Sequence, residues 1–292
     1  MRSYIGITAH FVEDFKLQSV MLACRRFKGS HTAENILSNY QQIISSFNLD
    51  NKVVTIITDN AANMQAFVTL PGAELDITDS DSDSDSEDTL LDITDIPGAL
   101  DYLPEHIPCF CHTLQLCVND GLNKASGIST TISKASRLVS HVRHSALASD
   151  ILADQPRLQA RNSTRWNSTN NMLKSLLKFD TTKLDQLTFS GKLTNYDMKI
   201  IQEIIDILSP FETATKQCEG QNIVTASLVI PCISGLKAEL SELSTTHKSK
   251  LLTTLLASVD TRLAKYEDRE SFQLATILDP RFKVAWCTPD EI

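Results

Sequence analysis

The sequence predicts an α/β first half followed by an all-α second half. Strand-like runs of β-branched and aromatic residues end near residue 112, and apolar residues at helical spacing dominate from there to the end of the chain. A dense acidic stretch interrupts the first half. We therefore expect two domains, one over residues 1–118 and an all-α domain over residues 119–292.

The first predicted element is an antiparallel β-hairpin. Tyr4–Val12 and Gln18–Cys24 are rich in residues that suit a pleated surface, and Glu13–Lys16 between them supplies a polar turn. Two such runs joined by a short polar turn are expected to pair with each other in the antiparallel sense.

An amphipathic helix and a buried strand follow the hairpin. Apolar residues recur at helical spacing from Ala33 to Phe47, with Ser30 or Thr32 as the N-cap. The run at 52–58 is nearly continuously apolar, as in a central strand covered on both faces. A strand, a helix and a further strand form a crossover, so we expect one mixed sheet of antiparallel and parallel strands.

Asp59 directly follows this strand, at the edge where open α/β sheets place their ligands. The carboxylate can serve as a metal ligand for phosphodiester chemistry or as the N-cap of a helix starting near Asn60. Two-metal chemistry needs two or three converging carboxylates, and the residue pattern offers only this one at a strand tip. The sequence also lacks a phosphate-binding glycine loop, a Gly-x-Ser-x-Gly elbow and a His-Glu-x-x-His pair.

The negative charge of the chain is local. Residues 74–101 hold eleven acidic and no basic residues, which leaves the rest of the chain close to neutral and open to a nucleic-acid partner. We expect residues 71–104 to form a disordered, solvated excursion, since like charges at this density cannot bury apolar area. Its serines are candidate phosphorylation sites.

The second half begins with a short strand at 106–112 and continues almost entirely as helices. Cys109, Cys111, His112 and Cys117 are zinc-ligand types, but a finger needs a second ligand pair, so packing in the core is the favoured interpretation. Seven cysteines without a signal peptide indicate reduced thiols inside the cell. No apolar run has spanning length, so no membrane contact is expected.

The polar cluster at 161–169 contains two guanidinium groups and an indole. These groups suit phosphate contacts and base stacking. The other interpretation is a helix start capped by Asn162 or Thr164, with Trp166 in the core. The residue pattern leaves both open.

Four motifs follow one another along the chain. They are Thr58-Asp59-Asn60-Ala61-Ala62-Asn63-Met64, Ile107-Pro108-Cys109-Phe110-Cys111-His112-Thr113-Leu114-Gln115-Leu116, Arg165-Trp166-Asn167-Ser168-Thr169 and Ala275-Thr276-Ile277-Leu278-Asp279-Pro280-Arg281-Phe282-Lys283. In this order they resemble the motifs of the hAT-superfamily transposases and their BED zinc-finger relatives. The resemblance covers nearly the whole chain, and Tyr4–Val12 is similar to the strand that follows the family's first catalytic Asp.

The resemblance implies an RNase H-like core interrupted by a large helical insertion, and magnesium-dependent DNA cleavage by an Asp-Asp-Glu triad. It makes Asp59 the candidate second acid and magnesium ligand. It assigns Cys109 and His112 to a structural Cys-x-x-His pair, and Arg165 and Trp166 to DNA binding, with the tryptophan stacking on a base.

The same resemblance places the first Asp and its strand before Met1 and the Glu beyond Ile292. A zinc-binding BED finger and a C-terminal homodimerisation region also lie outside the chain as written. With one acid of three, we expect the chain as it stands to be catalytically incompetent and to hold no cofactor.

Three functions follow from these expectations. The first is a nuclear, transposase-derived protein that binds DNA in a regulatory role. The second is an active magnesium-dependent DNA transposase of which this chain is a truncated part. The third is a protein-interaction scaffold whose acidic segment docks basic partners.

Overall fold

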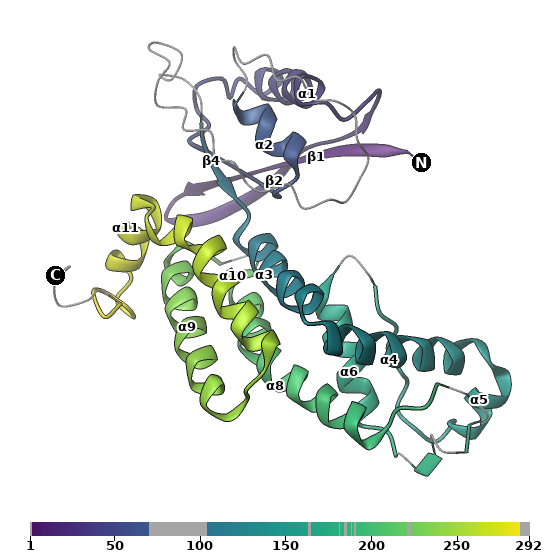
Figure 1. The fold of residues 1–292 in the computed structure, drawn as a ribbon. Helices are drawn as coiled ribbons and strands as arrows, with labels where there is room; N and C mark the ends of the chain where they lie inside the picture. The colour runs from purple at the N-terminus through teal and green to yellow at the C-terminus, as the bar shows by residue number, and fades with distance from the viewer. Residues whose placement is uncertain are drawn as a thin grey trace. The chain divides into compact units, whose positions relative to one another are not determined.

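The structure is a computed structural model, and it describes residues 2–69, 104–162, 165–180, 182–183, 186–187, 189, 191–220 and 223–286. The chain divides into two compact units, Met1–Cys109 and Phe110–Ile292 (Figure 1). Among the described residues, no helix combines the length and the apolar character that a membrane crossing requires.

The first unit opens with the predicted hairpin, which the structure confirms. Strands β1 (Ser3–Glu13) and β2 (Lys16–Phe27) pair antiparallel up to the Glu13 and Lys16 pair. The two residues of the turn, Asp14 and Phe15, have φ of 48° and 60°. Positive φ at both central residues is the signature of a turn whose twist matches that of the strands.

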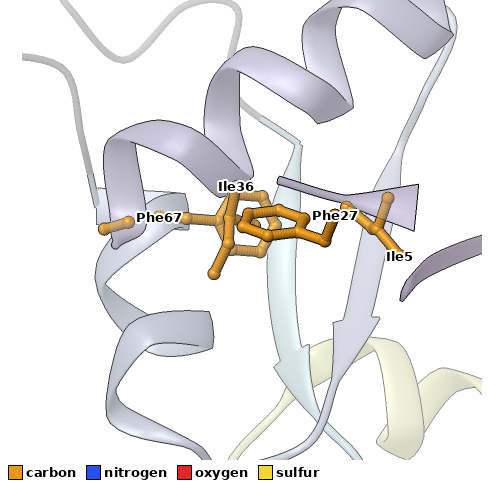
Figure 2. Packing of buried hydrophobic residues seen from close by; sticks show 5 residues of the cluster. Ile5, Phe27, Ile36 and Phe67 are labelled. Carbon is orange, nitrogen blue, oxygen red and sulfur yellow. The ribbon is translucent and has the colours of Figure 1, made fainter. Parts of the chain in front are cut away.

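Helix α1 (Ala33–Ser46) packs its apolar stripe on the hairpin. Thr32 is the N-cap and accepts a hydrogen bond from the backbone N–H of Asn35, which confirms one of the two predicted caps. Helix α2 (Ala62–Thr69) adds Phe67 to the same small core. Figure 2 shows this core, in which side chains of β1, β2, α1 and α2 meet: Ile5, Phe27, Ile36 and Phe67.

Strands β3 (Thr55–Thr58) and β4 (Glu105–Pro108) form a parallel pair. The expectation that this segment is covered on both faces is wrong, because Ile57 is 65% exposed. Within the described ranges the strands form two separate two-stranded sheets and not one mixed sheet. The predicted acidic excursion, apart from Pro104, lies outside the described residues.

The described part of the second unit consists of helices and the loops that join them, as predicted. A short 3-10 turn, Ala226–Leu228, precedes α9. The α-helices are α3 (Phe110–Lys124), α4 (Ser126–His144), α5 (Ala146–Ile151), α6 (Trp166–Leu177), α8 (Asn195–Cys218), α9 (Val229–Thr246), α10 (Lys250–Glu267) and α11 (Glu270–Leu278).

Helices α3 and α10 pack against each other along their length and run side by side in Figure 1. Gly121 permits the approach, because a Cβ at that position would lie 2.6 Å from Cδ2 of Leu255. A buried hydrogen bond of 2.6 Å joins Thr113 of α3 to Tyr266 of α10. The predicted boundary after residue 118 thus falls inside α3, whereas the packing divides the chain after Cys109.

Helix α8 crosses the unit and anchors α4. Its Thr194 and Asp197 form a capping box, and the buried Asp197 carboxylate pairs with Lys134 of α4 at 3.0 Å. Proline favours a helix end, but α8 continues for two turns beyond Pro210. Pro210 is buried, so packing of the surrounding apolar residues outweighs the backbone hydrogen bond that proline cannot donate.

Candidate nucleic-acid interface

Asp59 directly follows β3, as the sequence predicted, and its side chain is exposed. Its Oδ1 accepts a hydrogen bond of 3.2 Å from the backbone N–H of Ala61, two residues on. This Asx turn leads the chain into α2, which begins at Ala62. The carboxylate therefore has a local structural role in starting the helix.

The carboxyl ends of β3 and β4 lie at one edge of the parallel pair. Thr58 is in register with Pro108, so the next residues of the two strands, Asp59 and Cys109, follow at the same end. The backbone N–H of Cys109 donates to the carbonyl of Thr58 at 2.7 Å, and the Thr58 hydroxyl lies 2.9 Å from Nε2 of His106. This edge is held by hydrogen bonds within the unit.

The described residues do not provide a magnesium site. No group of three or more His, Cys, Asp or Glu side chains in the described ranges is placed to hold a metal ion. Asp59 is a single carboxylate, whereas two metal ions need several carboxylates that converge on them. The described residues therefore do not fit the magnesium that the resemblance implies.

The Cys-x-x-His pair does not form a closed zinc site within either unit. Cys109 is the last residue of the first unit, and His112 is the third residue of α3 in the second. Both side chains are half-buried. A structural zinc site needs four ligands, and no such set occurs among the described residues.

Trp166 is the first residue of α6 and is only 4% exposed. An indole buried to this extent cannot offer its face to a base in this conformation. Of the two interpretations that the sequence left open, the structure favours the packed tryptophan. The neighbouring polar residues shape the helix start, because Ser168 accepts from the backbone N–H of Asn162 and donates to the carbonyl of Arg165.

Arg165 is the N-cap residue of α6 by position and is exposed. It is one of five exposed arginines on α4 and on the segment that leads from α5 to α6. None of the five forms an ion pair with a carboxylate of the described residues. They are Arg137, Arg143, Arg157, Arg161 and Arg165.

The segment that carries three of these arginines is tied to both neighbouring helices. Arg143 of α4 donates to the carbonyl of Leu158 at 3.1 Å. The backbone N–H of Gln159 donates to Ser175 of α6 at 3.2 Å. The backbone of this segment is therefore held in place by α4 and α6. We call the five exposed arginines the arginine face.

The charge of this region distinguishes it from the rest of the helical unit. Residues 121–179 contain nine Lys and Arg but only two Asp and no Glu. Some basic residues elsewhere in the unit are paired with carboxylates, as Arg262 is with Asp120 at 2.7 Å and Lys237 with Glu267 at 2.7 Å. Of the five arginines, only Arg161 and Arg165 were predicted from the sequence. A running count of charge along the chain would have indicated the excess of basic residues over 121–179.

Comparison with known proteins gives the family. Residues 1–96 match the ZBED1 RNase-like domain, and residues 107–206 match the ZBED1 RNase-like helical domain, in the same order as the two units. The chain belongs to the hAT transposase and ZBED-related proteins. The resemblance stated from the four motifs is thereby confirmed, as is an RNase-like domain followed by a helical domain.

Several relatives of this ZBED-related chain carry transposase or BED-finger names. A Zea mays protein named for the AC transposase is 26% identical over 97% of this chain. The Hobo transposase of Drosophila melanogaster is 25% identical over 80% of it, and the human zinc finger BED domain-containing protein 6 is 30% identical over 61%. The chain spans 35%, 31% and 20% of the lengths of these three relatives.

Proposed function

We propose that this chain is part of a nuclear, hAT transposase-derived protein that binds DNA in a regulatory role, and that the arginine face contacts the phosphate backbone. The observation that carries the proposal is the set of exposed arginines on α4 and before α6 that have no carboxylate partner among the residues that the structure describes. The transposase names of the relatives support DNA as the polyanion.

Physical chemistry favours phosphate as the ligand of such a surface. A guanidinium group carries its charge at every physiological pH and presents several donors in a fixed plane that fits phosphate oxygens. Arginines without a carboxylate partner do not have to break an ion pair when they bind DNA. Because Arg143 is fixed to Leu158, the surface is also held in position before it binds.

Trp166 is not part of this proposal, since its indole lies in the core. We also propose that the described residues alone do not cleave DNA, because Asp59 has no converging carboxylates among them. For the first unit we propose the RNase H-like arrangement, in which a further strand joins β1 and β3 into one mixed sheet. Both strands are paired on one edge only among the described strands.

The test is the salt dependence of DNA affinity. Each phosphate contact contributes about 0.9 to the slope of log affinity against log salt concentration. Replacing Arg157, Arg161 and Arg165 together by glutamine should lower this slope by roughly two to three and should weaken binding of unrelated duplex sequences equally. Fluorescence anisotropy with a labelled duplex over a salt series measures both quantities.

The matched control replaces three exposed lysines of the same unit that have no ion pair among the described residues: Lys199, Lys248 and Lys250. This variant removes the same net charge and should leave most of the slope intact. Equal losses in the two variants would indicate a general charge effect, and an unchanged slope in the arginine variant would refute the arginine face.

The alternative function, a magnesium-dependent transposase, is favoured by the position of Asp59 alone. Its side chain is exposed at a strand end, and only Oδ1 accepts a described hydrogen bond. The test is strand cleavage by the longest form of the protein with magnesium. Cleavage that is lost in Asp59→Asn while DNA affinity is kept would establish the alternative.

A further inference from the structure

Two buried cysteines of the helical unit lie against each other. Cys218 is the last residue of α8, and Cys232 lies in the first turns of α9. Their Sγ atoms are 3.6 Å apart, and the two residues are 9% and 8% exposed. Because 14 positions of chain separate them, the contact depends on the packing of α8 against α9.

Cys232 is also among the residues that line an open hollow of about 550 Å³ beside α8 and α9. Pro231, Gly235 and Phe282 are among the other residues that line it. A small solute can therefore reach the neighbourhood of the Cys232 sulfur, although the thiol has little exposed area. Cys218 does not line this hollow.

We propose that Cys218 and Cys232 form an oxidative modification site, at which a hydroperoxide that enters through the hollow converts the two thiols into a disulfide between α8 and α9. To form the bond, the Sγ atoms have to approach from 3.6 Å to about 2.05 Å. Disulfides of proteins in reducing compartments are transient and report on oxidants.

The chemistry takes two steps. The Cys232 thiolate attacks one oxygen of the hydroperoxide, the O–O bond breaks, and the leaving oxygen takes up a proton, which gives a sulfenic acid on Cys232. The Cys218 sulfur then attacks the Cys232 sulfur, the S–O bond breaks, and water leaves with the Cys218 proton. The two thiols lose two electrons and two protons, and with hydrogen peroxide the oxidant becomes two molecules of water.

The surroundings assign the first step to Cys232. A hydrogen bond from the Cys218 thiol lowers the pKa of Cys232, although burial opposes this effect. The same contact with Cys232 raises the pKa of Cys218, and burial adds to it. Cys232 also lies near the N-terminus of α9, where the helix dipole favours a negative charge. Cys232, which is among the residues that line the hollow, is thus the cysteine whose thiol ionises more readily.

The test uses the intact chain, hydrogen peroxide, and alkylation with N-ethylmaleimide before digestion. Lys216 and Lys237 are consecutive trypsin sites, so the peptide 217–237 holds both cysteines and contains no methionine. We expect this peptide to lose two hydrogen atoms and to take up no maleimide after oxidation. Dithiothreitol should restore two alkylation sites, and the midpoint of thermal unfolding should rise reversibly by several degrees in the oxidised protein.

Three variants complete the test. In Cys218→Ser the sulfenic acid on Cys232 should persist and react with dimedone. In Cys232→Ser the Cys218 thiol should remain reduced. Cys24→Ser, which removes an exposed thiol of β2, should change neither result. The proposal would be overturned if the wild-type protein, folded during the peroxide treatment, gave a peptide 217–237 with both cysteines alkylated. A cross-link from Cys218 to its other neighbouring thiol, Cys111, would also overturn it.

Discussion

Replacing Gly121 by alanine tests the close packing of α3 on α10. The added Cβ would lie 2.6 Å from Cδ2 and 2.8 Å from Cγ of Leu255, and 3.0 Å from Cδ1 of Leu251. Carbon atoms in contact are normally about 3.5–4.0 Å apart. Both leucines are completely buried, so neither can turn into solvent to make room. The helices have to separate or the leucines have to leave their preferred rotamers.

The magnitude follows from two opposing effects. Overpacking a buried site costs about 1–3 kcal/mol. Alanine in place of glycine in a helix contributes about 1 kcal/mol in the opposite direction. We expect Gly121→Ala to lower the free energy of unfolding by up to about 2 kcal/mol. Gly235→Ala in α9 is the matched control, because a Cβ there meets no atom within 4 Å, and it should raise stability by about 1 kcal/mol.

The assay is urea unfolding followed by fluorescence of Trp166, which is buried in the helical unit. The second tryptophan, Trp286, is replaced by phenylalanine in every variant so that one indole reports. The free energy difference between the two alanine variants removes the effect of helix propensity and should be about 1–3 kcal/mol. Equal shifts of the unfolding midpoint in both variants would refute the close approach of α3 and α10.

Two further predictions concern buried polar groups. Burial raises the pKa of Asp197, but hydrogen bonds from Thr194 and Lys134 outweigh it and lower the pKa from 3.8 to about 2. Because the folded pKa is the lower one, this stabilisation is present above about pH 4 and is lost as the pH falls to about 2. The stability difference between wild type and Asp197→Asn, from urea unfolding at several pH values, should shrink over that window; a constant difference would contradict the ion pair. Tyr266→Phe should cost about 1–2 kcal/mol by removing the hydrogen bond to Thr113, and a double-mutant cycle with Thr113→Val should show that the two changes are not additive.

Local chemistry made part of the fold predictable. The hairpin follows from two β-rich runs around a polar turn. Thr32 was one of two predicted caps, because hydroxyls satisfy the first N–H groups of a helix. Pro210 shows the limit of such rules. The proline predicts a helix end, but the apolar residues on both sides of it pack in the same core, and α8 continues.

The sequence could not predict which side chains of the candidate site are exposed to solvent. A tryptophan beside arginines suits either a DNA surface or a core, and only the packing of α6 decides that Trp166 is buried. Ile57 gives the opposite case, since its apolar run predicts burial while the side chain is largely exposed. Arg137, Arg143 and Arg157 were missed because they are scattered in sequence and belong to none of the recognised motifs.

The parallel pair β3 and β4 has a consequence for the order in which the chain folds. Thr58 and His106, whose side chains bond at 2.9 Å, are 48 positions apart, whereas the hairpin joins residues that are close in sequence. Closing a long loop takes entropy before any contact is gained, so local structure should form first and the parallel pair last. Since that entropy grows only with the logarithm of loop length, the connection between these strands can lengthen or shorten at little thermodynamic expense. Relatives can therefore differ greatly in this connection and still share the edge at which Asp59 stands.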